Sequence, residues 1–229
     1  MVPVVTQVVM PMSEQINEDF QTAVSMTGFA SDQLYVLEST PTRITALMKL
    51  CKGTFVTDAA IELALKNWQG LEILILEGSC NVDDKLYVQG GYLRLPDAKR
   101  NNISAASDCI LFVKFNQFLS GDNGDRCIDT RIADEWLPGP VEGIEIRPLH
   151  VFDTESIMLL KWHHAAEFKP GLNPKGEEIM VVNGLLQNRD QLYRQYSWIR
   201  KPVEDWCRWH GNTGTLVYYK SGHFPDDPR

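Results

Sequence analysis

The stretch YRQYSWIRKPVEDWCRWHGNTGTLVYYKSGHF, residues 193–224, follows the same pattern as YVQGGYLRLPDAKRNNISAASDCILFVKFNQF, residues 87–118. An offset of 106 residues aligns the two halves without a gap, from Gly70 with Gly176 to Phe118 with Phe224. Within residues 72–96, nine of 25 positions are identical, whereas chance gives about one or two at average residue frequencies. An internal repeat of this length indicates two copies of one structural unit.

Both copies carry short runs rich in β-branched and aromatic residues that end at Gly, Pro, Asn or Asp. The paired runs are EILILEG with EIMVVNG, YLRLP with SWIRKP, and CILFVKF with TLVYYKS. They predict an all-β fold of two small barrels rather than a parallel sheet with crossover helices. Helical patterns are confined to SEQINEDFQTAV, residues 13–24, where Ser13 is a candidate N-cap, and TDAAIELALKNW, residues 57–68.

These patterns predict four parts of the chain. Residues 1–34 form an N-terminal extension with a short helix, and residues 35–118 form the first barrel. Residues 119–140 are polar and rich in turn-forming residues, so they are predicted to link the copies. Residues 141–229 form the second barrel.

The composition limits the partners that the chain can have. Lys and Arg number 22 against 30 Asp and Glu, for a formal net charge of -8, so the surface is expected to repel nucleic acid and anionic membranes. No window approaches the roughly 18 consecutive apolar residues of a membrane span. The N-terminus lacks the basic region of a signal peptide, and the five cysteines include no Cys-x-x-Cys pair. These features predict a soluble, cytoplasmic protein with reduced thiols.

The runs GEEIMVVNG, YRQYSWIRKP and GTLVYYKSGHF of the second copy resemble, in order and approximate spacing, the conserved segments of the ChrR-like cupin domains. The first copy shows the same resemblance through LEILILEG, YVQGGYLRLP and CILFVKF. The resemblance implies two tandem cupin barrels, which are double-stranded β-helices of the jelly-roll kind. These segments are informative about the scaffold, and much less so about activity.

The resemblance also implies where a metal would bind, because cupins hold a divalent metal with a His-x-His-x3-Glu cluster and a distant third histidine. In the second copy the two histidine positions fall on Gly171 and Asn173, and the third on Cys207, or on Trp206 if the turn is one residue shorter. Only the carboxylate is retained, as Glu177 or Glu178. The corresponding residues of the first copy are Leu65, Asn67, Leu71 and Asn101. A metal-free first barrel and a degenerate site in the second are therefore expected.

The loop from Trp206 to His210 is the candidate ligand pocket of the second copy. Aromatic walls with a few polar groups are typical of small-molecule sites. His210 is a candidate to replace the lost third ligand, alongside Glu177, Glu178, Asn173 and Cys207, and it is also compatible with a simple turn residue. The pocket candidates are Trp198, Trp206, Cys207, Trp209 and His210.

Two functions remain open from the sequence. The first is a non-catalytic small-molecule-binding or regulatory protein, which needs no cofactor. The second is a cupin dioxygenase that acts on a diketone or aryl ketone through an unconventional site, with Fe, Zn, Ni or Mn as the metal. In both, we expect a small-molecule ligand and no nucleic acid or membrane partner. Association into a homodimer through the barrel sheets is a further expectation.

Overall fold

The computed structural model describes residues 7–8, 34–39, 43–56, 70–97, 102–171, 175–189, 191–201 and 207–223. The chain divides into two compact units. The unit Ser13–Arg131 is called the first barrel below, and the unit formed by Met1–Met12 and Ile132–Arg229 is called the second barrel.

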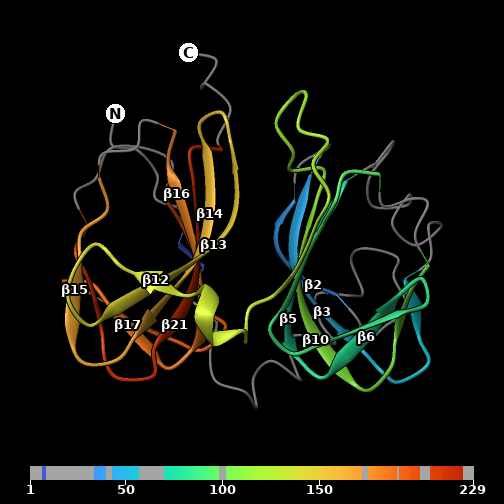
Figure 1. Cartoon of the computed structure of the whole chain (residues 1–229), viewed down its shortest axis with the longest axis horizontal. Coiled ribbons are helices and arrows are strands. Elements are labelled where there is room, and N and C mark those ends of the chain that lie inside the picture. The colour runs from blue at the N-terminus through green and yellow to red at the C-terminus, as the bar shows by residue number, and fades with distance from the viewer. Residues whose placement is uncertain are drawn as a thin grey trace. The chain divides into compact units, whose positions relative to one another are not determined.

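The second barrel consists of two antiparallel sheets around one core (Figure 1). The larger sheet has the order β1 (Gln7–Val8), β19 (Trp198–Lys201), β16 (Glu177–Asn183), β21 (Leu216–Ser221), β14 (Glu155–Trp162), β13 (Ile144–Phe152) and β12 (Leu137–Pro138). The smaller sheet has the order β15 (Ala166–Phe168), β20 (Trp209–Gly211), β17 (Leu185–Gln187) and β18 (Leu192–Arg194). A single apolar cluster joins Ile179 and Val217 of the first sheet to Leu186 and Trp209 of the second. The two sheets therefore enclose a common interior.

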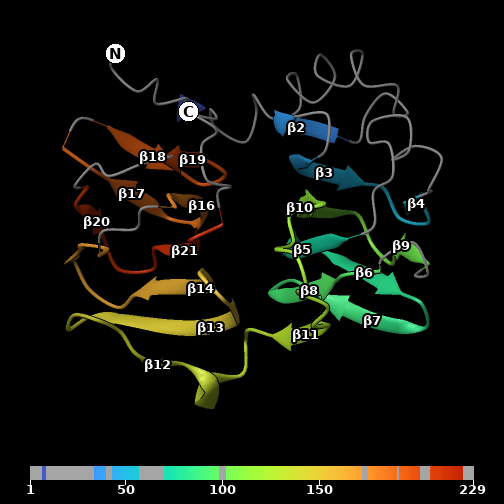
Figure 2. The same ribbon diagram turned by 90° about the horizontal axis from the view of Figure 1, so that it is seen from above.

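The first barrel has the same construction (Figure 2). Its larger sheet has the order β11 (Arg126–Asp129), β8 (Gly91–Leu95), β5 (Leu71–Glu77), β10 (Cys109–Phe115), β3 (Ile44–Leu50) and β2 (Leu34–Ser39). Its smaller sheet has the order β4 (Phe55–Val56), β9 (Ile103–Ala105), β6 (Ser79–Val82) and β7 (Lys85–Val88). The run β8-β5-β10-β3-β2 corresponds in sheet order to β19-β16-β21-β14-β13. The offset of 106 residues relates the first three strands of each run, which therefore hold equivalent places.

The turn after the central strand depends on glycine in both barrels. Gly78 follows β5 and Gly184 follows β16, with φ angles of 71° and 79°. A Cβ atom at Gly78 would lie 2.0 Å from the carbonyl oxygen of Asp108. Glycine is required there because it alone combines a positive φ with this close approach of backbone.

The all-β, jelly-roll-like fold predicted from the sequence is confirmed. The helices expected at residues 13–24 and 57–68 lie outside the described residues. Across the described ranges the one helix is a single 3-10 turn, Ala133–Glu135. No helix in this part of the chain has the length and apolar character needed to cross a membrane.

Strands also extend into the segments that the sequence left outside the barrels. Residues 7–8 pair with β19 of the second barrel, with Gln7 opposite Ile199. The segment 119–140 gives β11 to the first barrel and β12 to the second. Each barrel therefore completes its larger sheet with an edge strand from a segment expected to be an extension or a linker.

Candidate functional site

Four positions on the inner face of the second barrel carry polar side chains where the first barrel has apolar ones. Glu177 of β16 lies opposite Lys201 of β19 and Ser221 of β21, and Tyr219 lies two residues from Ser221. Residues at even spacing on a strand share a face. Because Ile179 and Ile199 belong to the apolar core, Glu177 and Lys201 also point into the barrel.

Glu177, Lys201 and Tyr219 form a connected group, called the polar cluster below. The Tyr219 hydroxyl donates a hydrogen bond to Glu177 Oε2 over 2.8 Å. Lys201 Nζ lies 3.7 Å from Glu177 Oε1, and each of these two side chains is 10% exposed. The Lys201 ammonium also lies 5.8 Å from the centre of the Trp209 ring, within the range of a cation–π contact.

Aromatic rings surround the polar cluster. Phe168 meets Tyr219 edge-to-face with 5.7 Å between ring centroids, and Tyr193 meets Trp209 with the same separation. Such pairs are stabilised by the ring quadrupoles and hold their planes in fixed orientations. Two aromatic pairs, one of which includes Tyr219 itself, therefore pack beside the polar groups.

Burial governs the electrostatics of the polar cluster. Burial raises the pKa of the Glu177 carboxyl, while the hydrogen bond from Tyr219 and the charge of Lys201 oppose the shift without cancelling it. Burial and the neighbouring Glu177 charge both raise the pKa of Tyr219, so its hydroxyl keeps its proton and remains a donor. Glu177 is consequently a stronger base than an exposed glutamate.

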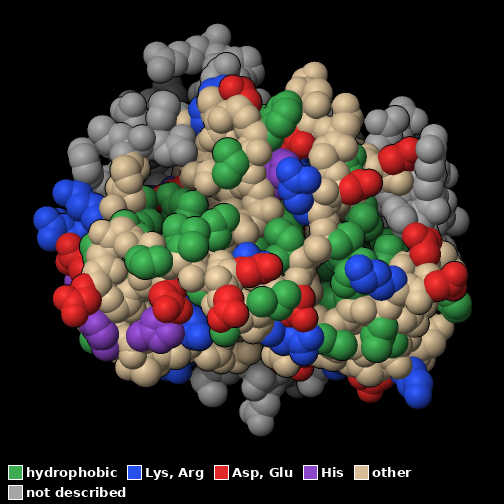
Figure 3. All heavy atoms as spheres, in the orientation of Figure 1, with side chains coloured by type: hydrophobic (Ala, Val, Ile, Leu, Met, Phe, Trp, Pro, Cys, Tyr) green, Lys and Arg blue, Asp and Glu red, His purple; other side chains and the backbone are tan. Residues whose placement is uncertain are grey.

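A pocket of about 580 Å³ opens on the second barrel, and its volume lies in the range of small-molecule sites. Tyr219 and Ser221 bring the inner face of the barrel into its wall, beside the apolar side chains of Ile146, Met158 and Phe168. The other wall residues are Pro138, Gly139, Pro140, Leu160, Lys169, Pro170 and Gly171. Figure 3 shows apolar side chains gathered on this barrel near β12. The pocket therefore combines apolar walls with polar groups at its inner face.

The described residues do not fit the metal centre that the cupin pattern implies. Gly171 lines the pocket, offers no side-chain ligand, and has nothing within 4 Å of an added Cβ. Cys207 is half-buried and packs against the apolar core. Asn173 lies outside the described residues. Glu177 does point inward, but the Lys201 ammonium stands 3.7 Å from its carboxylate, where its positive charge opposes a divalent cation.

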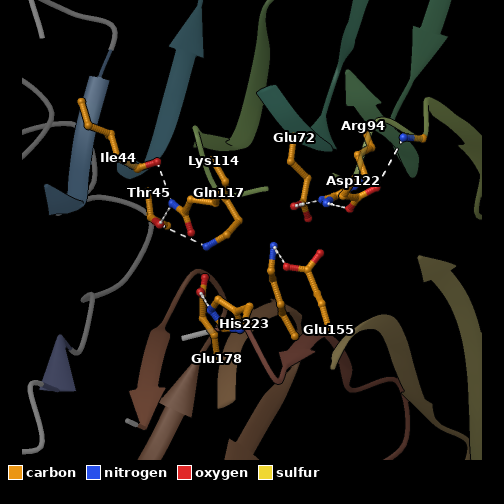
Figure 4. A network of polar contacts seen from close by, with 12 residues as sticks. Ile44, Thr45, Glu72, Arg94, Lys114, Gln117, Asp122, Glu155, Glu178 and His223 are labelled. Atoms are coloured by element: carbon orange, nitrogen blue, oxygen red, sulfur yellow. Dashed lines mark hydrogen bonds and ion pairs between the residues drawn. The ribbon is translucent and has the colours of Figure 1, made fainter. Parts of the chain in front are cut away.

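Two of the sequence candidates lie on the opposite face of the sheet from the polar cluster. Trp198 Nε1 donates to Glu178 Oε1 over 2.6 Å. Figure 4 shows His223 beside Glu178, where His223 Nε2 lies 3.2 Å from Glu178 Oε2. Since neighbours on a strand alternate between faces, Glu178 and Trp198 cannot reach the interior that Glu177 lines. The structure therefore separates the two glutamates that the sequence left as alternatives.

Trp209 and His210, two further pocket candidates, are neighbours on β20 and point to opposite faces of their sheet. Trp209 is fully buried in the core, whereas the side chain of His210 is 51% exposed and its Nε2 lies 3.4 Å from Glu167. Trp206 lies outside the described residues. Of the five pocket candidates, Trp209 is thus the one whose ring approaches the polar cluster within the described residues.

The other histidines do not gather at the pocket either. His163 and His164 are exposed, and His163 Nε2 lies 2.6 Å from Glu145. His150 is buried, with a ring nitrogen within 4.8 Å of a carboxylate oxygen of Glu155. Glu155 Oε2 is itself 3.1 Å from the Lys220 ammonium. The histidines of the second barrel therefore belong to several separate environments.

Sequence reasoning missed Lys201 and Tyr219. Both were visible as differences at the 106-residue offset, where Leu95 and Val113 stand in the first copy. A charged residue and a hydroxyl at positions that are apolar in the other copy mark an interior with a special role.

The structure thus defines a β-barrel protein whose second barrel holds a ligand-sized pocket beside buried polar groups. Residues 124–225 match the family model of the ChrR Cupin-like domain, and this match confirms the resemblance found in the second copy of the sequence. A search of curated protein sequences found no match.

Solved structures similar to this chain are cupin-fold proteins. A cupin 2 conserved barrel domain protein from Leptotrichia buccalis is 10% identical with a TM-score of 0.54, over 82% of this chain and 88% of that one. Salicylate 1,2-dioxygenase from Pseudaminobacter salicylatoxidans is 10% identical with a TM-score of 0.64, over 96% and 86%. The protein Ylba from E. coli is 12% identical with a TM-score of 0.55, over 86% and 84%. At these identities the likeness concerns the fold.

Proposed function

We propose that the second barrel binds a small aromatic molecule that carries a carbonyl group, and that it does so without a metal. The first barrel is a structural partner in the same chain. The observation that carries the proposal is the polar cluster, in which one cation and one hydroxyl converge on a buried carboxylate next to the pocket.

The walls of the pocket support the ligand class. Apolar and aromatic side chains favour a planar apolar body, while Ser221 and Tyr219 offer hydroxyls that pair with a carbonyl or hydroxyl oxygen. Lys201 stands beside Glu177 and supplies a positive charge where a cupin metal would otherwise act on the ligand. The donor set therefore favours electrostatic binding by side chains over coordination by an ion.

The interior of the first barrel supports a structural role for that barrel rather than a role in ligand binding. Its residues at the four equivalent positions are Leu71, Leu95, Val113 and Phe115, all buried in one apolar cluster. At these four positions the first barrel therefore presents no polar side chain to a ligand. Ligand binding is accordingly assigned to the second barrel.

Ligand-observed saturation-transfer NMR with propiophenone and 1-phenylbutane-1,3-dione tests the proposal on the full chain. We expect both ligands to bind in the presence of EDTA, and the signal to fall in Lys201→Met but persist in Leu95→Met, the matched change in the first barrel. Absence of binding to either ligand, or equal loss in both variants, would contradict the proposal.

The alternative dioxygenase predicts a different result in the same preparation. After incubation with Fe(II), Mn(II), Ni(II) or Zn(II), it requires one metal ion per chain to remain after gel filtration. It also requires oxygen uptake when 1-phenylbutane-1,3-dione is added. We expect neither, because Lys201 opposes a divalent cation at Glu177.

A further inference from the structure

The polar cluster has the composition of an acid–base site as well as a binding site. Glu177 is an inward-facing carboxylate, and Tyr219 and Lys201 approach its two different oxygens. A structural ion pair buried in a barrel needs no adjoining pocket. Here Tyr219 itself lines the pocket, and Glu177 and Lys201 each keep 10% exposure. Tyr219 is the member of the cluster that the pocket wall includes, and its hydrogen bond to Glu177 connects the carboxylate to that wall.

We infer that the second barrel catalyses proton transfer at the carbon next to the carbonyl group of its ligand, with Glu177 as the base and the Lys201 ammonium facing the carbonyl oxygen. This inference rests on the proposed function, because it names a reaction for the same ligand at the same site. Glu177 and Lys201 are its catalytic residues. Tyr219, through its hydrogen bond to Glu177, is a positioning residue.

The reaction balances within the site and needs no oxidant, reductant or metal. The Cα–H bond of the ketone breaks, its proton moves to a carboxylate oxygen of Glu177, and the electron pair passes to the carbonyl oxygen to give an enolate. The Lys201 ammonium stabilises that negative charge. The protonated Glu177 carboxyl then exchanges its proton with solvent water, and return of that solvent-derived proton to the same carbon restores the ketone. The observable result is therefore exchange of the α-hydrogens with solvent.

The geometry suits this division of roles. The carbonyl oxygen and the α-hydrogen of a ketone are attached to neighbouring carbons, so the base and the cation must stand side by side. Lys201 Nζ and Glu177 Oε1 do so at 3.7 Å. Burial raises the pKa of Glu177 and makes its carboxylate a stronger base, which supports the assignment.

The pocket wall adds a means of orientation. The edge-to-face pair of Phe168 and Tyr219 places aromatic surface beside the hydroxyl that holds Glu177. An aryl ketone that packs its ring on this surface presents its carbonyl side to the cluster. Aryl ketones with α-hydrogens are therefore the substrate class that we assign to the site.

Deuterium exchange of propiophenone in D2O with EDTA, followed by 1H NMR, tests the inference, with saturation transfer recorded on the same sample. We expect the wild-type chain to exchange the α-methylene hydrogens faster than buffer alone. In Glu177→Gln we expect a loss of about 100-fold or more with binding retained. The control variant His210→Ala, an exposed position outside the cluster, is expected to exchange at the wild-type rate.

The possible results separate the two proposals. Binding with exchange at the buffer rate overturns the inference and leaves the proposed function standing. Failure to bind overturns the proposed function. Wild-type exchange in Glu177→Gln overturns the assignment of the base. Should Glu177→Gln lose its native circular dichroism, Lys201→Met is the second variant, and undiminished exchange in a folded Lys201→Met overturns the role of the ammonium.

Discussion

The interiors of the two barrels differ at four positions that hold the same places in their sheets. In the first barrel Leu71 pairs across strands with Leu95 and Phe115, and in the second Glu177 pairs with Lys201 and Ser221. The backbone register is the same, so the scaffold does not determine whether this part of a barrel is an apolar core or a polar site. The side chains alone decide it.

The outward faces of the same strands show the opposite trend, because three polar positions are identical in the two barrels. They are Glu72 with Glu178, Arg94 with Arg200, and Lys114 with Lys220. In the first barrel Arg94 pairs with Glu72 over 3.2 Å and with Asp122, while Lys114 Nζ lies 3.1 Å from Thr45 Oγ1 (Figure 4). The changes from an apolar to a charged residue, at Glu177 and Lys201, thus lie on the inner face, whereas these three charged positions of the outward face are retained.

The most disruptive way to test this comparison is to place the carboxylate of the second barrel in the first. In Leu71→Glu the new side chain enters an apolar cluster, where neither Leu95 nor Val113 can pair with it. We expect a loss of about 3 to 5 kcal/mol in the free energy of unfolding, the usual cost of a buried charge without a partner. Urea denaturation followed by far-UV circular dichroism measures it.

Leu71→Met is the matched control, and its cost should stay below about 1.5 kcal/mol because it nearly conserves volume. A Leu71→Glu chain as stable as this control would mean that the first barrel tolerates a polar interior. The contrast between the two barrels would then carry no information about function.

The reverse exchange gives the second barrel the residues of the first. In Glu177→Leu/Lys201→Leu a buried ion pair is replaced by apolar side chains, a change that is often neutral or stabilising by about 1 to 4 kcal/mol. We expect unchanged or higher stability together with complete loss of ligand binding. Tryptophan fluorescence is a suitable probe of this barrel, because Trp68 is the only tryptophan before residue 132.

The single change Lys201→Leu is the counterpart of this double variant. It leaves Glu177 without its neighbouring cation, and we expect a loss of about 1 to 3 kcal/mol. If the double variant were the less stable of the two, the polar cluster would be a stabilising element of the barrel, and its retention would need no functional explanation.

These comparisons also show what the sequence could and could not predict. The strands were predictable because the 106-residue offset aligns runs such as EILILEG and EIMVVNG, whose β-branched residues and terminal glycines specify strand and turn. The family pattern likewise led to Glu177, since it occupies the position of the one retained ligand type.

Lys201 and Tyr219 were missed for a physical reason. Strands β16 and β21 are buried on both faces, so they lack the alternation of apolar and polar residues that reveals which side points inward. From the sequence, Tyr218 and Tyr219 are equivalent candidates, as are Arg200 and Lys201. The concentration of histidines was a misleading signal, because residue type says nothing about which face of a strand a side chain occupies.

A smaller effect is expected from the hydroxyl that holds Glu177. Tyr219→Phe keeps the aromatic packing against Phe168 and removes the 2.8 Å hydrogen bond. We expect a loss of about 1 kcal/mol in the unfolding free energy of the second barrel. The same substitution in a Glu177→Gln background gives a double-mutant cycle. If the two changes in unfolding free energy were strictly additive, Tyr219 and Glu177 would have no interaction energy, and this hydrogen bond would not contribute to stability.

The smallest effect is a pH dependence that distinguishes Glu177 from its apolar counterpart Leu71. Burial raises the pKa of Glu177 above its ordinary value of 4.5, so the folded chain holds this proton more tightly than the unfolded chain. The carboxyl therefore favours folding most below the unfolded pKa, and this contribution is lost as the pH rises through the folded pKa.

Glu177→Gln has no such proton. We expect the unfolding free energy of the wild type relative to Glu177→Gln to fall as the pH rises through this window, measured by urea denaturation at matched ionic strength. A difference that instead rises with pH would mean that Lys201 and Tyr219 outweigh burial, and that Glu177 is held as a structural carboxylate rather than as a base.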